Sequence, residues 1–288
     1  MWDEIINEIR KLKIIYNKSR RKINMRLKVI LSPDSNECRI PFNYQYSLSS
    51  AIYKLIQFAD ENYANDLHDR GLISPDGKPL KLFTFSYLFT PQKEIRQNQI
   101  LIRGNKLCYF YLSSPLIDGF VKNVVIGLFG RQELTIYNEK FHIIKVEPIA
   151  SPEFKSEMRF NCLSPFVIST MREHSGRLKP HYFRPNEDGL SEAVKNNLIR
   201  KYRTLHQKEP QDTQLQFLLD QIYIRSHDPK KLTKLITLKE GMDKEETKIR
   251  GIFVPFKMAG SVELMQIAWD AGLGVNCSQG FGCIDILN

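Results

Sequence analysis

The same order of elements, a strand followed by a helix and further strands, occurs twice along this chain of 288 residues. In the first half, MRLKVILSP (residues 25–33) predicts a strand, apolar residues at helical spacing in 48–59 predict a helix, and KLFTFSYLF (81–89) alternates as a strand does. In the second half, RFNCLSPFVIST (159–170) predicts a strand, and residues 190–207 predict a helix with one apolar stripe. The repeated order favours two units of the same type.

The remaining elements complete both halves. The first half also predicts a hairpin over 98–114 with its turn at Gly104-Asn105, a helix over 115–130 and a hairpin over 135–149 around Asn138-Glu139. The second half also predicts strands at 234–240, 248–260 and 280–287, and a helix at 261–272.

A proline-containing segment, EPIASPEFKSE, separates the halves and predicts a domain boundary near residues 148–157. We therefore expect an α+β chain of tandem ferredoxin-like (RRM-like) domains, one over 25–150 and one over 155–288. Residues 1–24 predict a basic amphipathic helix, which we interpret as an extension that precedes the folded part.

The charge balance bears on the partner. The chain carries 42 Lys and Arg against 32 Asp and Glu, a net charge of +10, which favours nucleic acid or an anionic membrane surface without choosing between them. No apolar run approaches the ~18 residues that span a bilayer, and the N-terminus lacks the features of a signal peptide. The five cysteines are scattered without a Cys-x-x-Cys pair. We expect a cytoplasmic protein with reduced thiols, no membrane segment, no metal site and no cofactor.

Two Gly-x-Gly steps stand close to the C-terminus, in AGLGVNCSQGFGCIDIL. A dinucleotide-binding fingerprint fails on element order, because a helix precedes these glycines and a strand follows them. A P-loop fails because the segment has no lysine. Two interpretations remain: a helix C-cap with a bulged strand, or a backbone surface that a phosphodiester chain approaches closely. The second makes the following residues candidate RNA contacts: Gly272, Gly274, Asn276, Ser278, Gln279, Gly280 and Gly282.

The same segment resembles the glycine-rich loop of the CRISPR-associated repeat-processing endoribonucleases, the Cas-six family within the repeat-associated RNA-binding proteins. Residues 272–282 match that loop in full: glycine, hydrophobic residue, glycine, five residues, and the same triplet again. IPFNYQYSLSSAIYKLI, LHD and KLFTFSYLF are similar to the family's N-terminal region. The resemblance covers the chain from about Met25 to its end.

This resemblance implies metal-independent cleavage of CRISPR precursor RNA within the repeat, with the substrate's 2′-hydroxyl as nucleophile. It assigns catalytic roles to Tyr53, His68 and Lys81, and Lys78 is the alternative to Lys81. Histidine suits proton transfer because its unperturbed pKa is about 6.5, and lysine suits a developing phosphorane charge. Without the resemblance, the tyrosine would be interpreted as packing, the histidine as a cap or surface residue, and the lysine as solvated.

Basic clusters give further candidate RNA contacts, although each can equally be a solvated face. REHSGRLKPHYFRP combines cations with aromatic rings, a mixture suited to unpaired RNA, and supplies Arg172, Arg177, Lys179 and Arg184. Further candidates for a phosphate track are Lys230 and Lys231, with Lys234, and the helix cations Lys195, Arg200, Lys201 and Arg203.

The expected partner is CRISPR repeat RNA, or precursor crRNA, with possible hand-over of the product to interference-complex subunits, by a monomer or a homodimer. The alternative is a scaffold subunit that binds repeat or guide RNA without cutting it, which would not need Tyr53, His68 and Lys81. A more distant alternative is a basic RNA-binding protein unrelated to CRISPR.

Overall fold

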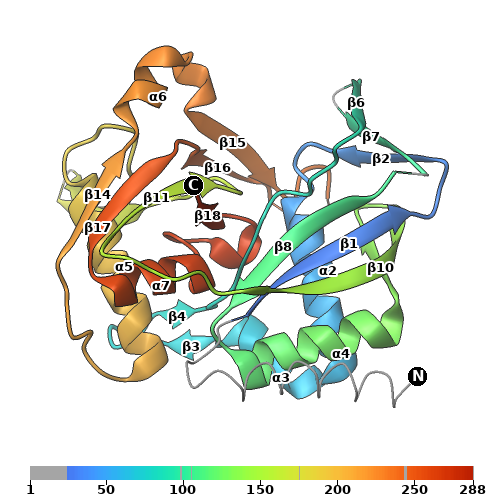
Figure 1. The fold of residues 1–288 in the computed structure, drawn as a ribbon, viewed down its shortest axis with the longest axis horizontal. Coiled ribbons are helices and arrows are strands. Elements are labelled where there is room, and N and C mark those ends of the chain that lie inside the picture. The colour runs from blue at the N-terminus through green and yellow to red at the C-terminus, as the bar shows by residue number, and fades with distance from the viewer. Residues whose placement is uncertain (1–24, 98, 105, 175, 243–244, 288) are drawn as a thin grey trace. The chain divides into compact units, whose positions relative to one another are not determined.

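The computed structural model describes residues 25–97, 99–104, 106–174, 176–242 and 245–287 (Figure 1). The predicted helical extension over residues 1–24 lies outside them. The chain forms two compact units. The first contains the chain up to Asp69 and Tyr87–Pro152, and the second contains Arg70–Ser86 and Glu153–Asn288.

The first unit contains a fully antiparallel sheet in the order β8-β1-β10-β9. These strands are β1 (Met25–Pro33), β8 (Cys108–Ser114), β9 (Glu133–Ile136) and β10 (Glu139–Ala150). On β1, Leu27, Val29 and Leu31 alternate toward the interior and are at most 1% exposed. The predicted strand at 25–33 and the predicted hairpin over 135–149 are confirmed, with Tyr137 and Asn138 between the two paired strands.

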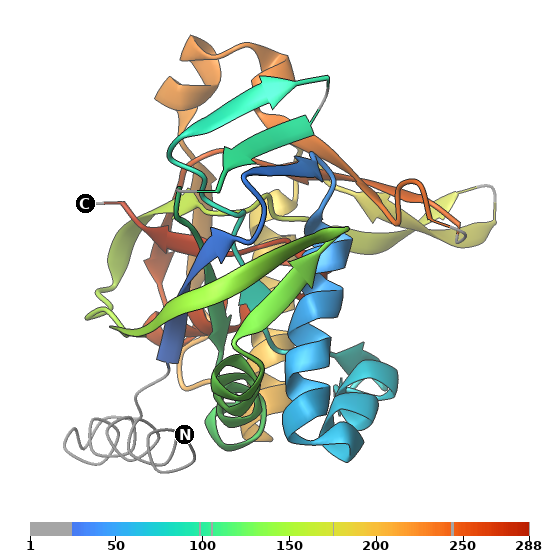
Figure 2. The same cartoon turned by 90° about the vertical axis from the view of Figure 1, so that its right-hand side faces the viewer.

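Helices α2 (Gln45–Ala59) and α4 (Lys122–Arg131) pack against each other beside this sheet (Figure 2). Their close approach depends on Gly127, because a Cβ at that position would overlap the backbone of Leu55. A π-helical turn, η1 (Ile117–Val121), leads into α4, and α3 (Glu61–Asp69) follows α2. The helices predicted in 48–59 and 115–130 are therefore confirmed, although the second opens with a π-turn.

A smaller sheet, in the order β2-β7-β6, overturns the predicted hairpin over 98–114. Its strands are β2 (Glu37–Pro41), β6 (Lys93–Arg96) and β7 (Gln99–Arg103), and β8 pairs instead with β1. The physical reason lies at Gly104, whose N–H donates to the Asn36 carbonyl at 3.0 Å. This contact holds the end of β7 against the chain that precedes β2, so the chain does not turn back into β8.

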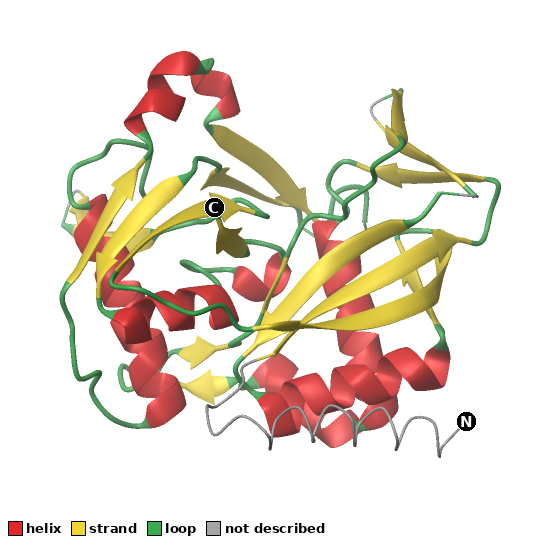
Figure 3. Cartoon of the chain, viewed as in Figure 1, coloured by secondary structure: helices red, strands yellow, loops and turns green. Residues whose placement is uncertain are grey.

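The second unit has the ferredoxin-like order of two strand–helix–strand halves (Figure 3). The elements are β11 (Glu157–Cys162), α5 (Leu190–His206), β14 (Leu215–Leu219), β17 (Phe256–Gly260), α7 (Val262–Ala271) and β18 (Ile284–Ile286). The sheet is antiparallel in the order β14-β17-β11-β18, which places the first strand beside the last. The expected ferredoxin-like architecture is confirmed.

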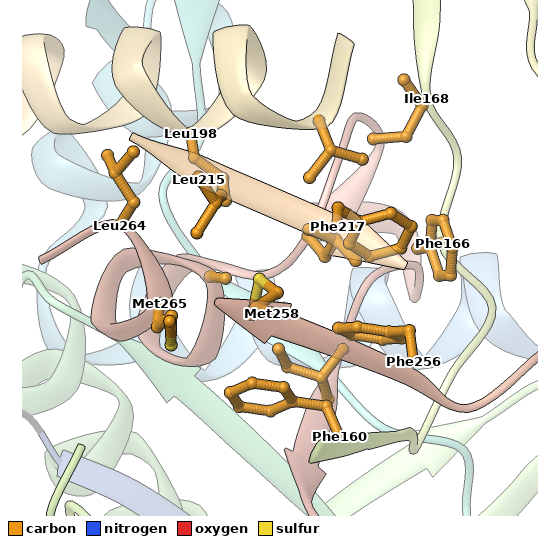
Figure 4. Close-up of a cluster of buried hydrophobic side chains, with 14 of the residues drawn as sticks. Phe160, Phe166, Ile168, Leu198, Leu215, Phe217, Phe256, Met258, Leu264 and Met265 are labelled. Atoms are coloured by element: carbon orange, nitrogen blue, oxygen red, sulfur yellow. The ribbon is translucent and has the colours of Figure 1, made fainter. Parts of the chain in front are cut away.

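The core of this unit combines aromatic and aliphatic side chains between its sheet and helices (Figure 4). Phe160 and Phe256 stack with their centroids 5.5 Å apart, and Phe166 meets Phe256 edge-on. Leu264 and Met265 of α7 are fully buried against this cluster. Burial of such side chains contributes roughly 1.5–3 kcal/mol each, so these contacts fix α5 and α7 on the sheet.

Several shorter elements connect the frame of the second unit. They are β3 (Leu72–Ile73), β4 (Pro79–Leu80), β5 (Thr84–Phe85), β12 (Ser169–His174), β13 (Arg177–Tyr182), α6 (Gln221–Ser226), η2 (Pro229–Lys231), β15 (Thr233–Leu238), β16 (Thr247–Ile252) and η3 (Cys277–Gln279). We call the β12–β13 pair the ribbon.

Three predicted strands are too long. The strand predicted over 159–170 divides into β11 and β12 around Pro165, and that over 248–260 divides into β16 and β17 around Pro255, since proline cannot donate to a ladder. The strand predicted over 81–89 is regular only at β5. Every side chain from Leu82 to Ser86 is buried, so the alternating pattern does not correspond to one buried and one exposed face.

Candidate functional site

Tyr53 and His68 lie together in the first unit. Tyr53 is on α2 and His68 is in the last turn of α3, and their ring centroids are 5.4 Å apart in an edge-on arrangement. Tyr53 is half-buried, and burial, reinforced by Tyr63, raises the pKa of its hydroxyl. The His68 side chain is 66% exposed, so its ring is open to a large solute. The pair thus joins a protonated phenol to an accessible imidazole.

Asp69 defines the tautomer of this histidine. Its Oδ1 lies 2.8 Å from Nδ1 of His68. An ionised carboxylate only accepts hydrogen bonds, so the proton sits on Nδ1, and the lone pair of the neutral ring is at Nε2. Within the described residues, no hydrogen bond engages Nε2. Both partners are exposed, so the pair adds little to stability and mainly orients the ring.

A pocket of about 850 Å³ lies wholly within the second unit. Lys81 belongs to this unit, and both it and its alternative Lys78 line the pocket. The remaining lining comes from residues 79, 80 and 82, the base of the ribbon, one face of α5 and residues 274–279.

The charge of the pocket is one-sided. Of the described residues that line it, four are Lys or Arg and none is Asp or Glu, the cations being Lys78, Lys81, Arg200 and Lys201. Amide and hydroxyl side chains, including Asn196, Asn276, Ser278 and Gln279, fill most of the remaining polar lining. Cations with hydrogen-bonding side chains and no carboxylate suit a polyanion that also presents base edges or sugars.

The carboxylate of Asp76 borders this cationic set. Asp76 forms ion pairs with Arg200 at 3.6 Å and with Lys78 at 3.7 Å, and accepts a 2.5 Å hydrogen bond from Ser74. The Ser74 hydroxyl, and then Arg200 and Lys78, hold the pKa of Asp76 below its usual range. Asp76 therefore carries its charge at neutral pH and offsets part of the positive potential of the pocket.

The four glycines near the C-terminus all have φ between +73° and +89° and are all buried. At Gly274 and Gly282 a Cβ would overlap the backbone of Val167 and of Leu273 respectively, and at Gly272 it would lie within 3 Å of the Thr84 and Cys277 side chains. What approaches Gly272, Gly274 and Gly282 so closely is the chain itself. Of the candidate RNA contacts in this segment, Gly274, Asn276, Ser278 and Gln279 line the pocket, and Gly272, Gly280 and Gly282 do not.

Backbone N–H groups of this segment already bond within the chain. The N–H of Leu273 donates to the Gly282 carbonyl, that of Val275 to Val167, and that of Gly282 to Pro165, at 2.7–2.8 Å. These donors hold the loop in shape. The segment therefore presents to the pocket chiefly the side chains of residues 275–279.

The ribbon has two unlike faces. Arg172 pairs directly with Lys179, so both lie on one face, and alternation places Arg177 there too. Met171 pairs with Pro180 on the opposite face, and these two residues, with Tyr182, line the pocket. The predicted cations of the ribbon therefore do not line the pocket, which an apolar and aromatic face borders instead.

Apart from Arg200 and Lys201, the remaining cations predicted as RNA contacts do not line the pocket. Glu187 binds Arg172 at 2.9 Å and His181 at 2.5 Å, and accepts a hydrogen bond from the backbone N–H of Arg184. Lys230 and Lys231 are exposed in η2. Of the helix cations, Lys195 pairs with Glu192 and Arg203 with Glu209, and neither lines the pocket.

Two kinds of feature are absent from the residues that the structure describes. No group of three or more His, Cys, Asp and Glu side chains there is arranged to hold a metal ion. In the same part of the chain, no helix has both the length and the apolar character needed to cross a bilayer.

The fold is that of a tandem ferredoxin-like protein, its second unit carries a cationic pocket, and comparisons with known proteins identify its family. The model for "CRISPR-associated protein Cas6, N-terminal" matches residues 39–147, and that for "CRISPR associated protein Cas6, C-terminal" matches residues 149–286. The CRISPR-associated endoribonuclease Cas6 1 of Methanocaldococcus jannaschii is 31% identical over 91% of this chain and 92% of its own length. The chain belongs to the Cas6 family of CRISPR-associated endoribonucleases, which confirms the resemblance.

Solved structures agree with this assignment. One described as CRISPR associated protein Cas6 is 28% identical, has a TM-score of 0.72 and covers 92% of this chain and 100% of its own. Another, described as a RAMP protein binding different RNA substrates, is 21% identical with a TM-score of 0.74 over 92% of this chain and 100% of its own, and supports the fold.

Two features of the site escape the sequence analysis. Asp69 stands in the quoted LHD triplet, and adjacency to a histidine was the available signal. Asp76 stands in a predicted loop, and nothing in the sequence ties it to Arg200, which is 124 positions away.

Proposed function

We propose that this protein cleaves CRISPR precursor RNA within its repeats and so releases guide RNAs, which pass to an interference complex. Membership of the Cas6 family supports the reaction class. The net charge of +10 and the cationic pocket support an RNA substrate.

The cleavage proceeds without a metal ion. The 2′-oxygen of one ribose attacks the adjacent phosphorus, and the bond from phosphorus to the 5′-oxygen of the next nucleotide breaks. The products are a 2′,3′-cyclic phosphate and a 5′-hydroxyl. One group must remove the proton from the 2′-hydroxyl, another must protonate the leaving 5′-oxygen, and positive charge must stabilise the phosphorane.

His68 is the proton-transfer residue in this proposal, as general acid or general base. Its exposed ring, with Asp69 on Nδ1, leaves Nε2 for the substrate. Tyr53 supports it through the edge-on contact of its ring with the imidazole, while its own hydroxyl is buried and burial raises the pKa of that group, so that it stays protonated. Lys81, with Lys78 as the alternative, supplies the charge for the phosphorane.

The pocket of the second unit holds part of the RNA chain. Arg200 and the two lysines of the 78–82 segment neutralise phosphates, and the amide side chains of Asn276 and Gln279 bond to bases or sugars. Tyr182 and Met171 border the same space and offer an apolar surface on which an unstacked base can lie.

The observation that carries the proposal is the Tyr53–His68 pair in a chain of this family. The test incubates a repeat RNA with the protein in EDTA, beside the same RNA with a 2′-deoxy substitution at the cut site. We expect cleavage in EDTA of the first RNA only, with a cyclic phosphate end. Cleavage that needs metal, or that survives the 2′-deoxy substitution, contradicts the mechanism. Tight binding of both RNAs with no cleavage supports the alternative, a scaffold that binds repeat RNA.

A further inference from the structure

Lys201 is a lysine of α5 whose ammonium group is withdrawn from solvent. The residue is 4% exposed, although it is one of the four cations in the pocket lining. A buried ammonium is costly unless its donors are satisfied, and burial lowers the pKa of this amine. Lys201 therefore needs a role that compensates for its burial.

The hydrogen-bond acceptors around the Lys201 ammonium group indicate that role. Nζ donates to the Gly272 carbonyl at 2.5 Å, to the Ala271 carbonyl at 3.3 Å and to Cys277 Sγ at 3.3 Å. An ammonium has three N–H donors, so these acceptors use all of them. The two carbonyls end α7, where a helix leaves its acceptors without intrahelical partners and where its dipole favours a cation.

A second side chain of α5 grips the same loop. Asn197 precedes Lys201 by four positions and so lies on the same helix face, and its Oδ1 accepts the N–H of Gly274 at 3.1 Å. We call residues 271–282 the glycine segment. The side chains of Asn197 and Lys201 together hold the start of this segment at residues 271, 272 and 274, and Lys201 also contacts its middle at Cys277. The next residues, 275–279, line the pocket.

We propose that Lys201 is a positioning residue, which holds the glycine segment in the conformation that binds RNA and makes no phosphate contact itself. This inference rests on the proposed binding of RNA in the pocket. Its neighbour Arg200 is the opposite case, because its side chain is 27% exposed, borders the pocket and pairs only weakly with Asp76 at 3.6 Å. Adjacent cations on one helix thus have separate roles.

The experiment compares Lys201→Met with Arg200→Gln by two measurements. The first is amide hydrogen exchange of the segment 273–283 without RNA, with β17 as the internal reference. The second is the affinity for repeat RNA as a function of salt, at a temperature where each variant is folded.

Lys201→Met should speed exchange of the segment by about 10- to 100-fold, the range expected for lost hydrogen bonds to a charged group. It should weaken RNA binding at every salt concentration without changing the slope of log K against log salt. Arg200→Gln should leave exchange unchanged and lower that slope by about 0.7, the value for one lost phosphate contact on a single strand.

Unchanged exchange in Lys201→Met would overturn the anchoring role, and faster exchange with unchanged affinity would overturn its link to RNA. A slope reduced by about 0.7 would mean that Lys201 itself meets a phosphate. If Lys201→Met does not fold, Cys277→Ala removes one of the three acceptors and should give the same pattern at smaller amplitude. Failure of the wild-type protein to bind RNA would instead contradict the proposed function. The exchange measurement, which is made without RNA, would still test whether Lys201 anchors the glycine segment.

Discussion

The ring of His68 meets the ring of Tyr53 edge-on at 5.4 Å, which joins the end of α3 to the middle of α2. The arrangement fixes the imidazole on one side by a ring contact and on the other by the Asp69 carboxylate. A histidine oriented in this way, yet 66% exposed, has little to contribute to stability. This geometry fits the proton-transfer role that we propose for His68.

Replacement of His68 by Ala should lower the single-turnover cleavage rate by about 10²–10⁴ and leave RNA affinity nearly unchanged, because only proton transfer is lost. His142→Ala is the matched control. That histidine also pairs with a neighbouring carboxylate, Asp34, at 2.7 Å and is also exposed, in the same unit. Equal rate losses in both variants, or a parallel loss of binding in His68→Ala, would show that His68 is structural.

The two lysines of the 78–82 segment should separate by kinetics. If Lys81 stabilises the phosphorane, Lys81→Gln lowers the rate at saturating RNA, since that charge develops only in the transition state. Lys78→Gln should then weaken binding and reduce the salt slope by about 0.7 while the saturated rate is preserved. If instead Lys78→Gln lowers the rate at saturating RNA and Lys81→Gln reduces the salt slope, the catalytic role belongs to Lys78.

Removal of the carboxylate beside the pocket should strengthen RNA binding. Asp76→Asn releases Arg200 and Lys78 from their ion pairs, and we expect a several-fold higher affinity with a steeper salt dependence. Asp188→Asn, at an exposed carboxylate outside the pocket lining, controls for net charge. Equal gains in the two variants would indicate a long-range charge effect only.

The pH dependence of this gain follows from the lowered pKa of Asp76. A carboxyl whose pKa is lowered by folding keeps its stabilising pairs above the usual value of about 4 and loses them as the pH falls through the lowered value. The affinity difference between Asp76→Asn and the wild-type protein should therefore be constant from pH 8 to pH 5. A difference that shrinks within that range would mean that Asp76 titrates there.

Gly282→Ala should destabilise the second unit more than Gly77→Ala. Both glycines have positive φ, +73° and +77°, so each substitution costs about 1–2 kcal/mol of conformational strain. At Gly77 nothing lies within 4 Å of an added Cβ, whereas at Gly282 it would overlap the Leu273 backbone, which adds about 1–3 kcal/mol. Denaturant unfolding of both variants measures the difference. Equal losses of unfolding free energy in the two variants would mean that the loop accommodates the Cβ at position 282 without cost.

Periodicity was sufficient for the elements that bury one face. The stripe of Val194, Leu198 and Tyr202 in α5 is buried as predicted, because a helix on a sheet must cover one side of itself. The hairpin at Gly104 failed because glycine there serves a contact with Asn36, which is 68 positions away, and short-range patterns carry no such information. Contacts between residues that are distant in the sequence account for this error. Contacts of the same kind also set the geometry of the candidate site.

For the candidate site, too, the sequence identified residues but not the contacts between them. Tyr53 and His68 could be named from the resemblance, but the edge-on contact between them depends on how α3 returns toward α2. Lys201 was predicted, with three other cations of the same helix, as a candidate for a phosphate track, the alternative being a solvated face. Its position three residues after Leu198 and seven after Val194 was the available signal, since that spacing lies along the buried stripe.

The membership of residues 70–86 in the second unit has a practical consequence for dissecting this protein. A fragment that starts at Glu153 would lack Thr84, whose hydroxyl donates to the Phe281 carbonyl at 2.9 Å, and Phe85, whose carbonyl accepts from Ser164. It would also lack the lysines at 78 and 81. No single cut of the polypeptide yields both halves whole, so separate expression needs the 70–86 strip supplied in trans or grafted by a short linker.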